Sequence, residues 1–447
     1  MKAALFALSA LALALPGQAM AKPVLMISID GLRPGDVIEA EQRGLKIPNL
    51  RRMLTQGAHA EGVVGILPTV TYPSHTTLLT GASPAAHGIV NNTTFDPLQI
   101  NQGGWYWYAS DIKVPTLWSA AGVAGLSVGN IHWPVSVGAD GIAWNLPQIW
   151  RTGHGDDTKL VASLSTPGLL PELERDTGLT YAQGIDESIE GDENRSAFAS
   201  SMIRLHRPDF VTVYFTALDH QQHQDGPDTP GARAVLERID SLIGRVTAAE
   251  LAVHPDATIA LVSDHGFEPI SHETSLFRTF VDAGLIQLDK DDKVAAWEAM
   301  PWPSGGSVAV VLARPDDSAL EAQVGELLHA LAADPANGIA TVADRAGFAG
   351  FHANPQASFY LDMRLGWSAA GFAGGAAPLT GTPHYKGTHG YFPSAAHLRS
   401  TFLVMGPGIA PGRSLGLIDM RAIAPTLAKV LEVKLDGAEL APLELGK

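Results

Sequence analysis

Carboxylate and imidazole side chains recur in short polar segments that suit a shared site. Asp30-Gly31 and Asp264-His265-Gly266 each follow a short apolar run, while Asp219 and His223 are spaced about one helical turn apart. His389 stands in a turn-like, Gly-rich segment. Singly these motifs are weak, because a chain with sixteen histidines contains an Asp-x-x-x-His pair by chance and an Asp after a strand can simply cap a helix.

Together these residues predict a metal centre; they are Asp30, Asp219, His223, Asp264, His265 and His389. Three carboxylates packed together repel one another unless cations lie between them. Two divalent cations would relieve the repulsion and suit an in-line displacement at phosphorus. Because the chain has no cysteine, all ligands must be nitrogen or oxygen, so two Zn2+ are the first choice and Mn2+ or a Zn/Mg mixture the second.

The elements that must position these side chains are predicted to be parallel strands. Short apolar, β-rich runs span residues 24–29, 210–215 and 258–263, and each is followed at once by a polar or Gly-rich segment that contains an acid. Apolar residues recur at helical spacing from Val235 to Val246, between the second and third runs. This alternation predicts an α/β fold whose mostly parallel central sheet is flanked by helices. Ligands of such sheets bind beyond the carboxyl ends of the strands, where these acids lie.

The composition changes from about residue 276 to residue 384. An aromatic and Pro/Gly-rich piece precedes a strand-like run at 307–312 and a helical pattern in which Ser318 and Glu321 have capping-box spacing. We expect a smaller α+β subdomain inserted here into a catalytic domain that spans residues 22–447.

Residues 1–21 have the form of a signal peptide, with Lys2, an apolar run and the ending Ala19-Met20-Ala21. The alternative is an uncleaved anchor, but the run is short for a bilayer and ends in Pro16-Gly17. No later segment is long and apolar enough to span a membrane, so we expect an exported, periplasmic protein. The sequence does not indicate the oligomeric state.

The net charge of −16 argues against a nucleic-acid duplex as the main partner, since phosphate tracks need basic surface. A small phosphorylated substrate remains compatible with it if a local cation attracts the phosphate.

The order of the motifs resembles the alkaline phosphatase superfamily. Asp-Gly after the first strand, Thr71-Tyr72-Pro73-Ser74-His75 closing with Thr80-Gly81, then Asp-x-x-x-His, Asp-His-Gly and His-Gly-Tyr occur in the superfamily's order. Within it the nucleotide pyrophosphatase/phosphodiesterase branch is the most similar, over about residues 23–407. The specificity lies in the order of five motifs.

This resemblance implies roles for individual residues. One metal would be bound by Asp219, His223 and His389, and the other by Asp30, Asp264 and His265. Thr71 corresponds to the nucleophile, whose oxygen completes the second metal's shell, and Asn92 to the asparagine that binds a non-bridging phosphoryl oxygen. Tyr72 and Tyr214 correspond to the aromatic rings on either side of the base in nucleotide-cleaving members.

The implied chemistry suits these residue types. A threonine hydroxyl is a poor nucleophile at neutral pH, and coordination to a dication lowers its pKa. Thr71 also precedes a helix expected to begin near Pro73, whose N-terminus favours an anionic phosphate. In isolation, Thr71, Ser74 and Thr76 would be better explained as helix-capping residues.

Two rival functions remain beside the phosphodiesterase. A phosphomonoesterase of the same superfamily would need extra cationic groups near Thr71, and only Arg33 and Lys386 lie close to a motif. A non-catalytic exported zinc-binding protein would use the metal ligands without Thr71. Ser74, where many nucleotide-cleaving relatives have asparagine, and the segment Tyr391-Phe392-Pro393 after the last ligand depart from the animal members' pattern.

Overall fold

The first strand, which is buried on both faces, organises the main layer of the protein. A computed structural model describes residues 22–100, 104–149, 155–371 and 378–446; the expected signal peptide, residues 1–21, lies outside this range. In β1 (Val24–Ile29), Leu25, Ile27 and Ile29 pack into one hydrophobic cluster, and Val24 and Met26 pack into another. Because successive strand residues point to opposite faces, both faces of the sheet are covered.

The central sheet confirms the predicted α/β class. Its order is β20 (Arg413–Ser414), β2 (Ala58–His59), β19 (Phe402–Met405), β7 (Thr258–Val262), β1, β6 (Phe210–Phe215), β4 (Val128–Ile131) and β5 (Trp144–Leu146). From β7 to β5 all neighbours pair in parallel, whereas β19 is antiparallel to both of its neighbours. The three runs predicted as strands are β1, β6 and β7, which are adjacent.

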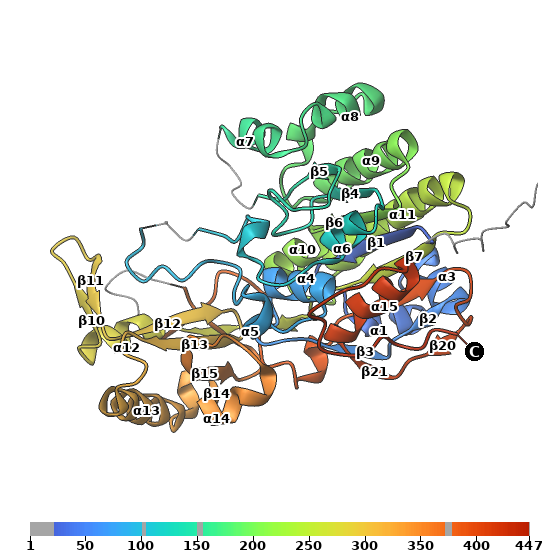
Figure 1. The fold of residues 1–447 in the computed structure, drawn as a ribbon. Coiled ribbons are helices and arrows are strands. Elements are labelled where there is room, and N and C mark those ends of the chain that lie inside the picture. Colours follow the sequence, from blue (N-terminus) through green and yellow to red (C-terminus); the bar gives the residue numbers. More distant parts are fainter. Residues whose placement is uncertain (1–21, 101–103, 150–154, 372–377, 447) are drawn as a thin grey trace, which may run out of the picture.

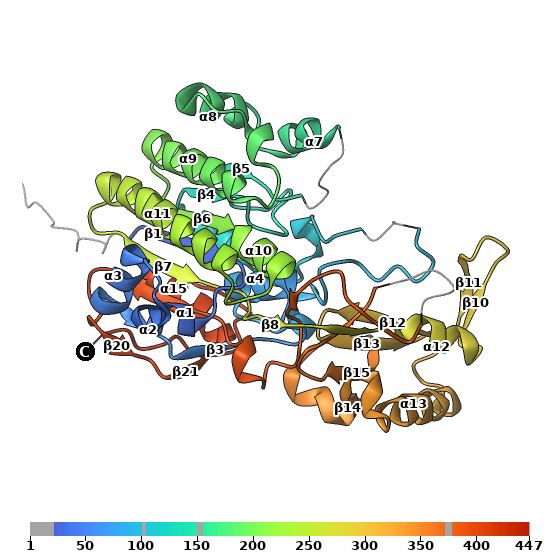
Figure 2. The same ribbon diagram turned by 180° about the vertical axis from the view of Figure 1, so that it is seen from behind.

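Helices cover the two faces of this sheet, as Figures 1 and 2 show from opposite sides. One face carries α3 (Pro48–Gln56), α9 (Ile189–His206) and α11 (Pro230–Val253). The other carries α4 (Thr71–Thr80), α6 (Leu117–Val123) and α15 (Ile423–Leu431). The helix predicted around residues 235–246 is the middle of α11. Among the described residues, none of the helices combines the length and apolarity needed to cross a membrane.

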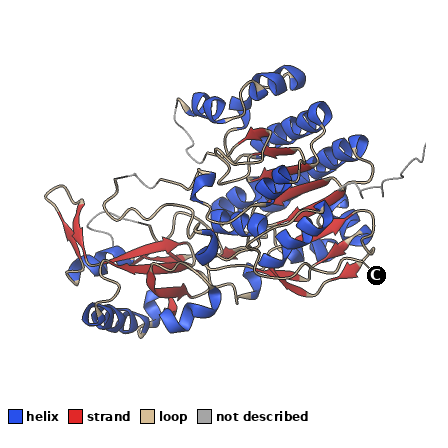
Figure 3. Cartoon of the chain, viewed as in Figure 1, coloured by secondary structure: helices blue, strands red, loops and turns tan. Residues whose placement is uncertain are grey.

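A second, antiparallel sheet lies beside the first, at the left of Figure 3. Its order is β12 (Ala299–Ser304), β13 (Ser307–Leu312), β15 (Ala357–Met363) and β14 (Ile339–Asp344). Packed on one face are α12 (Leu276–Asp282) and α13 (Ser318–Ala332). These elements fall inside the predicted insertion at 276–384, although their core also includes Tyr391 and Leu398. The expected Ser318 capping box is wrong: Asp317 caps α13, accepting from the amides of Ala319 and Leu320.

The turn between β12 and β13 connects the second sheet to the segment that follows β18 (Gly387–Thr388). The amide of Gly306 donates to the carbonyl of His389 at 2.7 Å, and the ring of Tyr391 packs against Gly306. A Cβ on residue 306 would lie only 2.2 Å from Tyr391 Cγ. The second sheet therefore holds the backbone of His389 in place.

Gly306→Ala tests this connection. The added methyl overlaps the Tyr391 ring, so we expect a loss of about 1–3 kcal/mol in the free energy of unfolding, as for other overpacked sites. Denaturant unfolding measures it. Gly350→Ala is the matched control, because a Cβ there meets no heavy atom within 4 Å. Equal stability of both variants would contradict the role given to this turn.

Candidate active site

The first group of predicted ligands lies at the carboxyl ends of β1 and β7. Asp30 directly follows β1, and Asp264 and His265 follow β7 after one serine. All three side chains are buried. His265 Nε2 lies 3.2 Å from Asp30 Oδ1 and 3.1 Å from Asp264 Oδ2. Parallel pairing of the two strands thus brings together residues more than two hundred positions apart in the chain.

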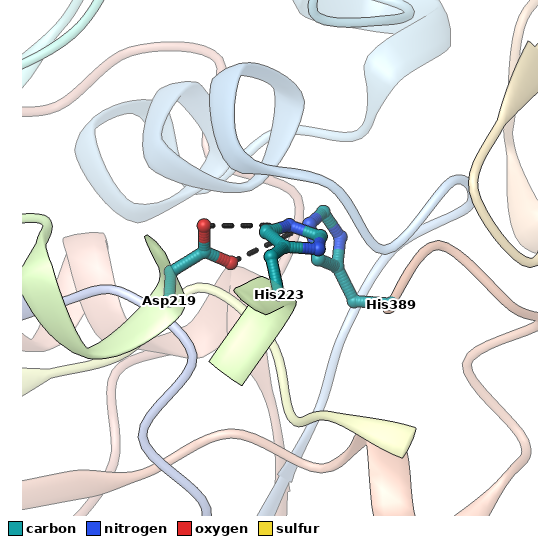
Figure 4. A group of neighbouring side chains, drawn as sticks. All are labelled: Asp219, His223 and His389. Carbon is teal, nitrogen blue, oxygen red and sulfur yellow. Dashed lines mark ion pairs between the residues drawn. The ribbon is translucent and has the colours of Figure 1, made fainter. Parts of the chain in front are cut away.

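The second group combines α10 (Ala217–Asp225), which follows β6, with the turn after β18 (Figure 4). Asp219 and His223 lie one turn apart on α10, with His223 Nε2 3.4 Å from Asp219 Oδ2. His389, from the turn after β18, places its Nε2 3.6 Å from Asp219 Oδ1. In each group the potential ligand atoms lie within 4.8 Å of one another.

The two groups adjoin. The rings of His265 and His389 stack with centroids 3.6 Å apart and an 11° angle between their planes. All six residues that the sequence predicted as metal ligands therefore lie in one place.

The three histidines share one hydrogen-bonding arrangement. The Nδ1 atoms of His223, His265 and His389 lie 2.9–3.1 Å from the backbone carbonyls of Gly387, Gly266 and Thr69, respectively. A carbonyl only accepts, so each Nδ1 carries the proton and each neutral ring presents an Nε2 lone pair to the carboxylates. Histidines that bind metals characteristically donate their other N–H in this way.

Burial sets the charge balance of the site. It lowers the pKa of His223 to about 4 and of His389 to about 3, and the pKa of His265 well below its usual value. Burial, reinforced by neighbouring carboxylates, raises the pKa of Asp30 and Asp219 well above the usual range. At neutral pH the imidazoles are therefore uncharged and do not neutralise the carboxylates.

Divalent cations fit this donor set. Four buried atoms that face the two groups lack a hydrogen-bond partner among the described residues: Asp30 Oδ1, Asp219 Oδ1, Asp264 Oδ2 and His265 Nε2. A buried polar atom without a partner costs free energy, and metal ions in the two groups would satisfy all four atoms. Carboxylate oxygens and neutral imidazole nitrogens are ligands of zinc and of other borderline dications.

Thr71 lies at the start of α4, facing the same region. The helix begins at Thr71 itself, two residues before the expected start near Pro73, and Val70 is the preceding cap residue. The Thr71 side chain lines a cavity of about 260 Å³ together with Asp30 and Asp219. A hydroxyl at this position lies at the positive end of the helix dipole, which favours anions, although Pro73 has no N–H and the Tyr72 amide is already bonded to Asn92.

Asn92 borders the same cavity and is oriented by the backbone of Tyr72. Its Oδ1 accepts a 2.8 Å hydrogen bond from the Tyr72 amide, so its NH2 group is the end that remains for a ligand. Asn92 can therefore offer a neutral donor close to Thr71.

The two predicted aromatic platforms are placed differently from each other. Tyr72 lines the cavity beside Trp105, with ring centroids 5.1 Å apart. Tyr214 is buried, its hydroxyl donates to Asp30 Oδ2, and its ring is covered by His75 and His132. This packing suits Tyr214 to holding Asp30 in place; Tyr214 also borders the cavity, so a role beside a bound base stays a prediction.

Several side chains at the site were not assigned there from the sequence. His75, interpreted as structural, donates from Nδ1 to the Thr71 carbonyl and accepts from the Ser28 hydroxyl through Nε2. Its position four residues after Thr71 is a usable signal, since such residues share a helix face. Trp105, Gln148, Glu187 and Tyr385 also line the cavity. They come from loops whose path the sequence motifs do not reveal.

A larger cavity of about 400 Å³ adjoins the first. The two share Asn92, His223, Tyr385 and His389, and the larger one continues toward the β12–β13 turn and Glu273. A phosphodiester whose phosphorus is bound at Thr71 would therefore have two cavities available for its two substituents.

The chain is similar in sequence to a family of phosphate-ester hydrolases. The family model described as type I phosphodiesterase/nucleotide pyrophosphatase matches residues 24–392. Ectonucleotide pyrophosphatase/phosphodiesterase family member 3 of Rattus norvegicus is 24% identical over 260 residues, which are 56% of this chain and 25% of the relative. Family member 1 of Homo sapiens is 27% identical over 258 residues, 55% of this chain and 24% of the relative. The chain thus spans about a quarter of the length of these curated relatives.

Solved structures support the fold. Human ectonucleotide pyrophosphatase/phosphodiesterase 5 superposes with a TM-score of 0.64 at 21% identity, covering 95% of this chain and 97% of that one. The murine counterpart, an inactive threonine-to-alanine variant in complex with AMP, gives the same TM-score at 20% identity. The match over residues 24–392 confirms the expectation from the motif order: the chain belongs to the type I phosphodiesterase/nucleotide pyrophosphatase family.

Proposed function

We propose that this protein is an exported, metal-dependent phosphodiesterase or nucleotide pyrophosphatase that cleaves phosphate diesters or phosphoanhydrides through a phosphothreonine intermediate on Thr71. The observation that carries the proposal is the position of the Thr71 hydroxyl, at a helix N-terminus and in one cavity with Asp30 and Asp219, which belong to the two ligand groups. Membership of the family supports it. So does the murine relative whose threonine-to-alanine variant is inactive and binds AMP.

Two Zn2+ ions per chain are proposed as cofactors. Asp30, Asp264 and His265, with the Thr71 oxygen, would hold one, and Asp219, His223 and His389 the other. When bound, such cations lower the pKa of a coordinated hydroxyl or water and neutralise charge on phosphoryl and departing oxygens.

The chain's own residues perform the remaining tasks. Thr71 Oγ loses its proton and attacks phosphorus, forming a P–O bond while the bond to the leaving oxygen breaks. The Asn92 NH2 group donates to a non-bridging oxygen, a contribution of about 3 kcal/mol if it acts as a single oxyanion donor does. A water molecule then attacks the phosphothreonine, and cleavage of the P–Oγ bond restores the hydroxyl. For nucleotide substrates, Tyr72 is the better placed of the two predicted aromatic platforms.

The charge of the cavity favours diesters over the rival monoesters. A bound monoester has three charged oxygens and calls for an additional cationic side chain. The described residues that line the cavity at Thr71 include neither lysine nor arginine. Arg33, one of the two basic residues near a motif, is instead paired with Asp36 and Asp228.

Thr71→Ala tests the nucleophile. Losing the hydroxyl should lower kcat/KM for an aryl phosphodiester by at least about a thousandfold, because no other group can form the covalent intermediate. Bound metal should remain. The control is Thr76→Ala, on the same helix, whose hydroxyl bonds only to the Tyr72 carbonyl. A fully active Thr71→Ala protein would point to the rival non-catalytic zinc-binding role or to another nucleophile.

Substrate preference distinguishes the two enzymatic alternatives. We expect a higher kcat/KM for bis(p-nitrophenyl) phosphate than for p-nitrophenyl phosphate, since the cavity lacks a basic side chain for the third phosphate oxygen. Steady-state release of p-nitrophenol measures both. A preference for the monoester would replace the phosphodiesterase with the phosphomonoesterase.

Metal removal tests the cofactor. Dialysis against a chelator should abolish turnover and lower the melting temperature, because unneutralised buried carboxylates then repel one another. Added Zn2+ should restore both; Mn2+ with Mg2+ is the second combination to compare. Turnover that survives complete removal of metal would rule out the proposed cofactor.

A further inference from the structure

One carboxylate at the cavity is not accounted for by metal binding. Glu187 lines the cavity with Thr71, Tyr72 and Trp105, and its side chain is 20% exposed. It is absent from both metal-binding groups. Its Oε2 lies 3.3 Å from Nδ1 of His220, a side chain that is 44% exposed and does not line the cavity. The Glu187–His220 pair thus presents its negative end to the cavity.

The charge of Glu187 reaches other walls of the cavity. Burial raises the pKa of the Tyr72 and Tyr385 hydroxyls, and the negative charge of Glu187 raises both further. The pKa of Asp219 is also raised, first by burial and then by the negative charge of Glu187. The described residues that line the cavity include no lysine or arginine, and the positive groups that act on Glu187, His220 and Arg195, lie outside this lining.

A phosphodiester has two substituents on phosphorus, of which one leaves and the other stays attached to Thr71. The retained substituent must lie in one of the two cavities described above. The smaller cavity contains Thr71 and Asn92 as well as Glu187, whereas the larger one contains Asn92 but not Thr71. The retained substituent is therefore assigned to the wall formed by Tyr72, Trp105 and Glu187.

We infer that Glu187 determines substrate specificity by charge: phosphodiesters with a cationic retained substituent react best, those with a neutral one less well, and those with an anionic one worst. This rests on the proposed function. Opposite charges a few ångströms apart in a partly buried cavity attract strongly, and like charges repel equally strongly. The rings of Tyr72 and Trp105 add attraction for a cation. Substrates with further phosphate groups on the retained side are disfavoured.

The test uses three p-nitrophenyl phosphodiesters that share a leaving group and differ only in the retained substituent: methyl, 2-aminoethyl or 2-carboxyethyl. kcat/KM is measured with the zinc-loaded full chain for the wild type, Glu187→Gln and Glu273→Gln. Glu187→Gln should lower the aminoethyl-to-methyl ratio about tenfold and raise the carboxyethyl-to-methyl ratio by a similar factor. Ratios to the methyl ester cancel any general loss of activity caused by disturbing His220.

Glu273→Gln is the matched control, because Glu273 lines only the larger cavity. It should leave both ratios unchanged. Unchanged ratios in Glu187→Gln, or shifted ratios in Glu273→Gln, would overturn the inference and leave the proposed function standing. If the wild type shows no Thr71-dependent hydrolysis of even the methyl ester, the proposed function fails, and the inference with it.

Discussion

Repulsion among the buried carboxylates of Asp30, Asp219 and Asp264 is the constraint on which the site depends. The facing imidazoles do not relieve it, because they are neutral, with their Nδ1 protons donated to backbone carbonyls. Carboxylate oxygens and Nε2 lone pairs therefore face one another at 3.1–3.6 Å. Divalent cations would convert this unfavourable arrangement into a binding site, close to the threonine hydroxyl at the start of α4.

The scaffold supplies this arrangement from four directions. Three adjacent parallel strands, β6, β1 and β7, deliver five of the six ligands at their carboxyl ends, and the turn held by the second sheet delivers His389. A buried ion pair fixes the start of α10: Asp192 accepts from the amides of Thr216 and Ala217, and Arg195 donates to the Thr216 hydroxyl. The orientation of Asp219 and His223 thus depends on α9 as well as on their own helix.

Much of this could be predicted from the sequence because the informative residues are local. The apolar runs at 24–29, 210–215 and 258–263 identified adjacent strands, and the acids after them met at one edge. Residues that reach the site only through the tertiary fold of a loop were harder to assign to it. Nothing near Glu187 in the sequence indicates that its loop returns to Thr71. Nor does the motif reveal that the hydroxyl of Tyr214, a residue expected to flank a base, donates to Asp30.

Each of the two ligand groups, Asp30–Asp264–His265 and Asp219–His223–His389, is proposed to bind its own divalent cation. Counting the zinc bound per chain, by elemental analysis of the folded protein, tests it most directly. We expect two ions in the wild type and one each in Asp219→Asn and Asp264→Asn, since each substitution removes a ligand from only one group. A single ion in the wild type, or two ions retained in both variants, would contradict it.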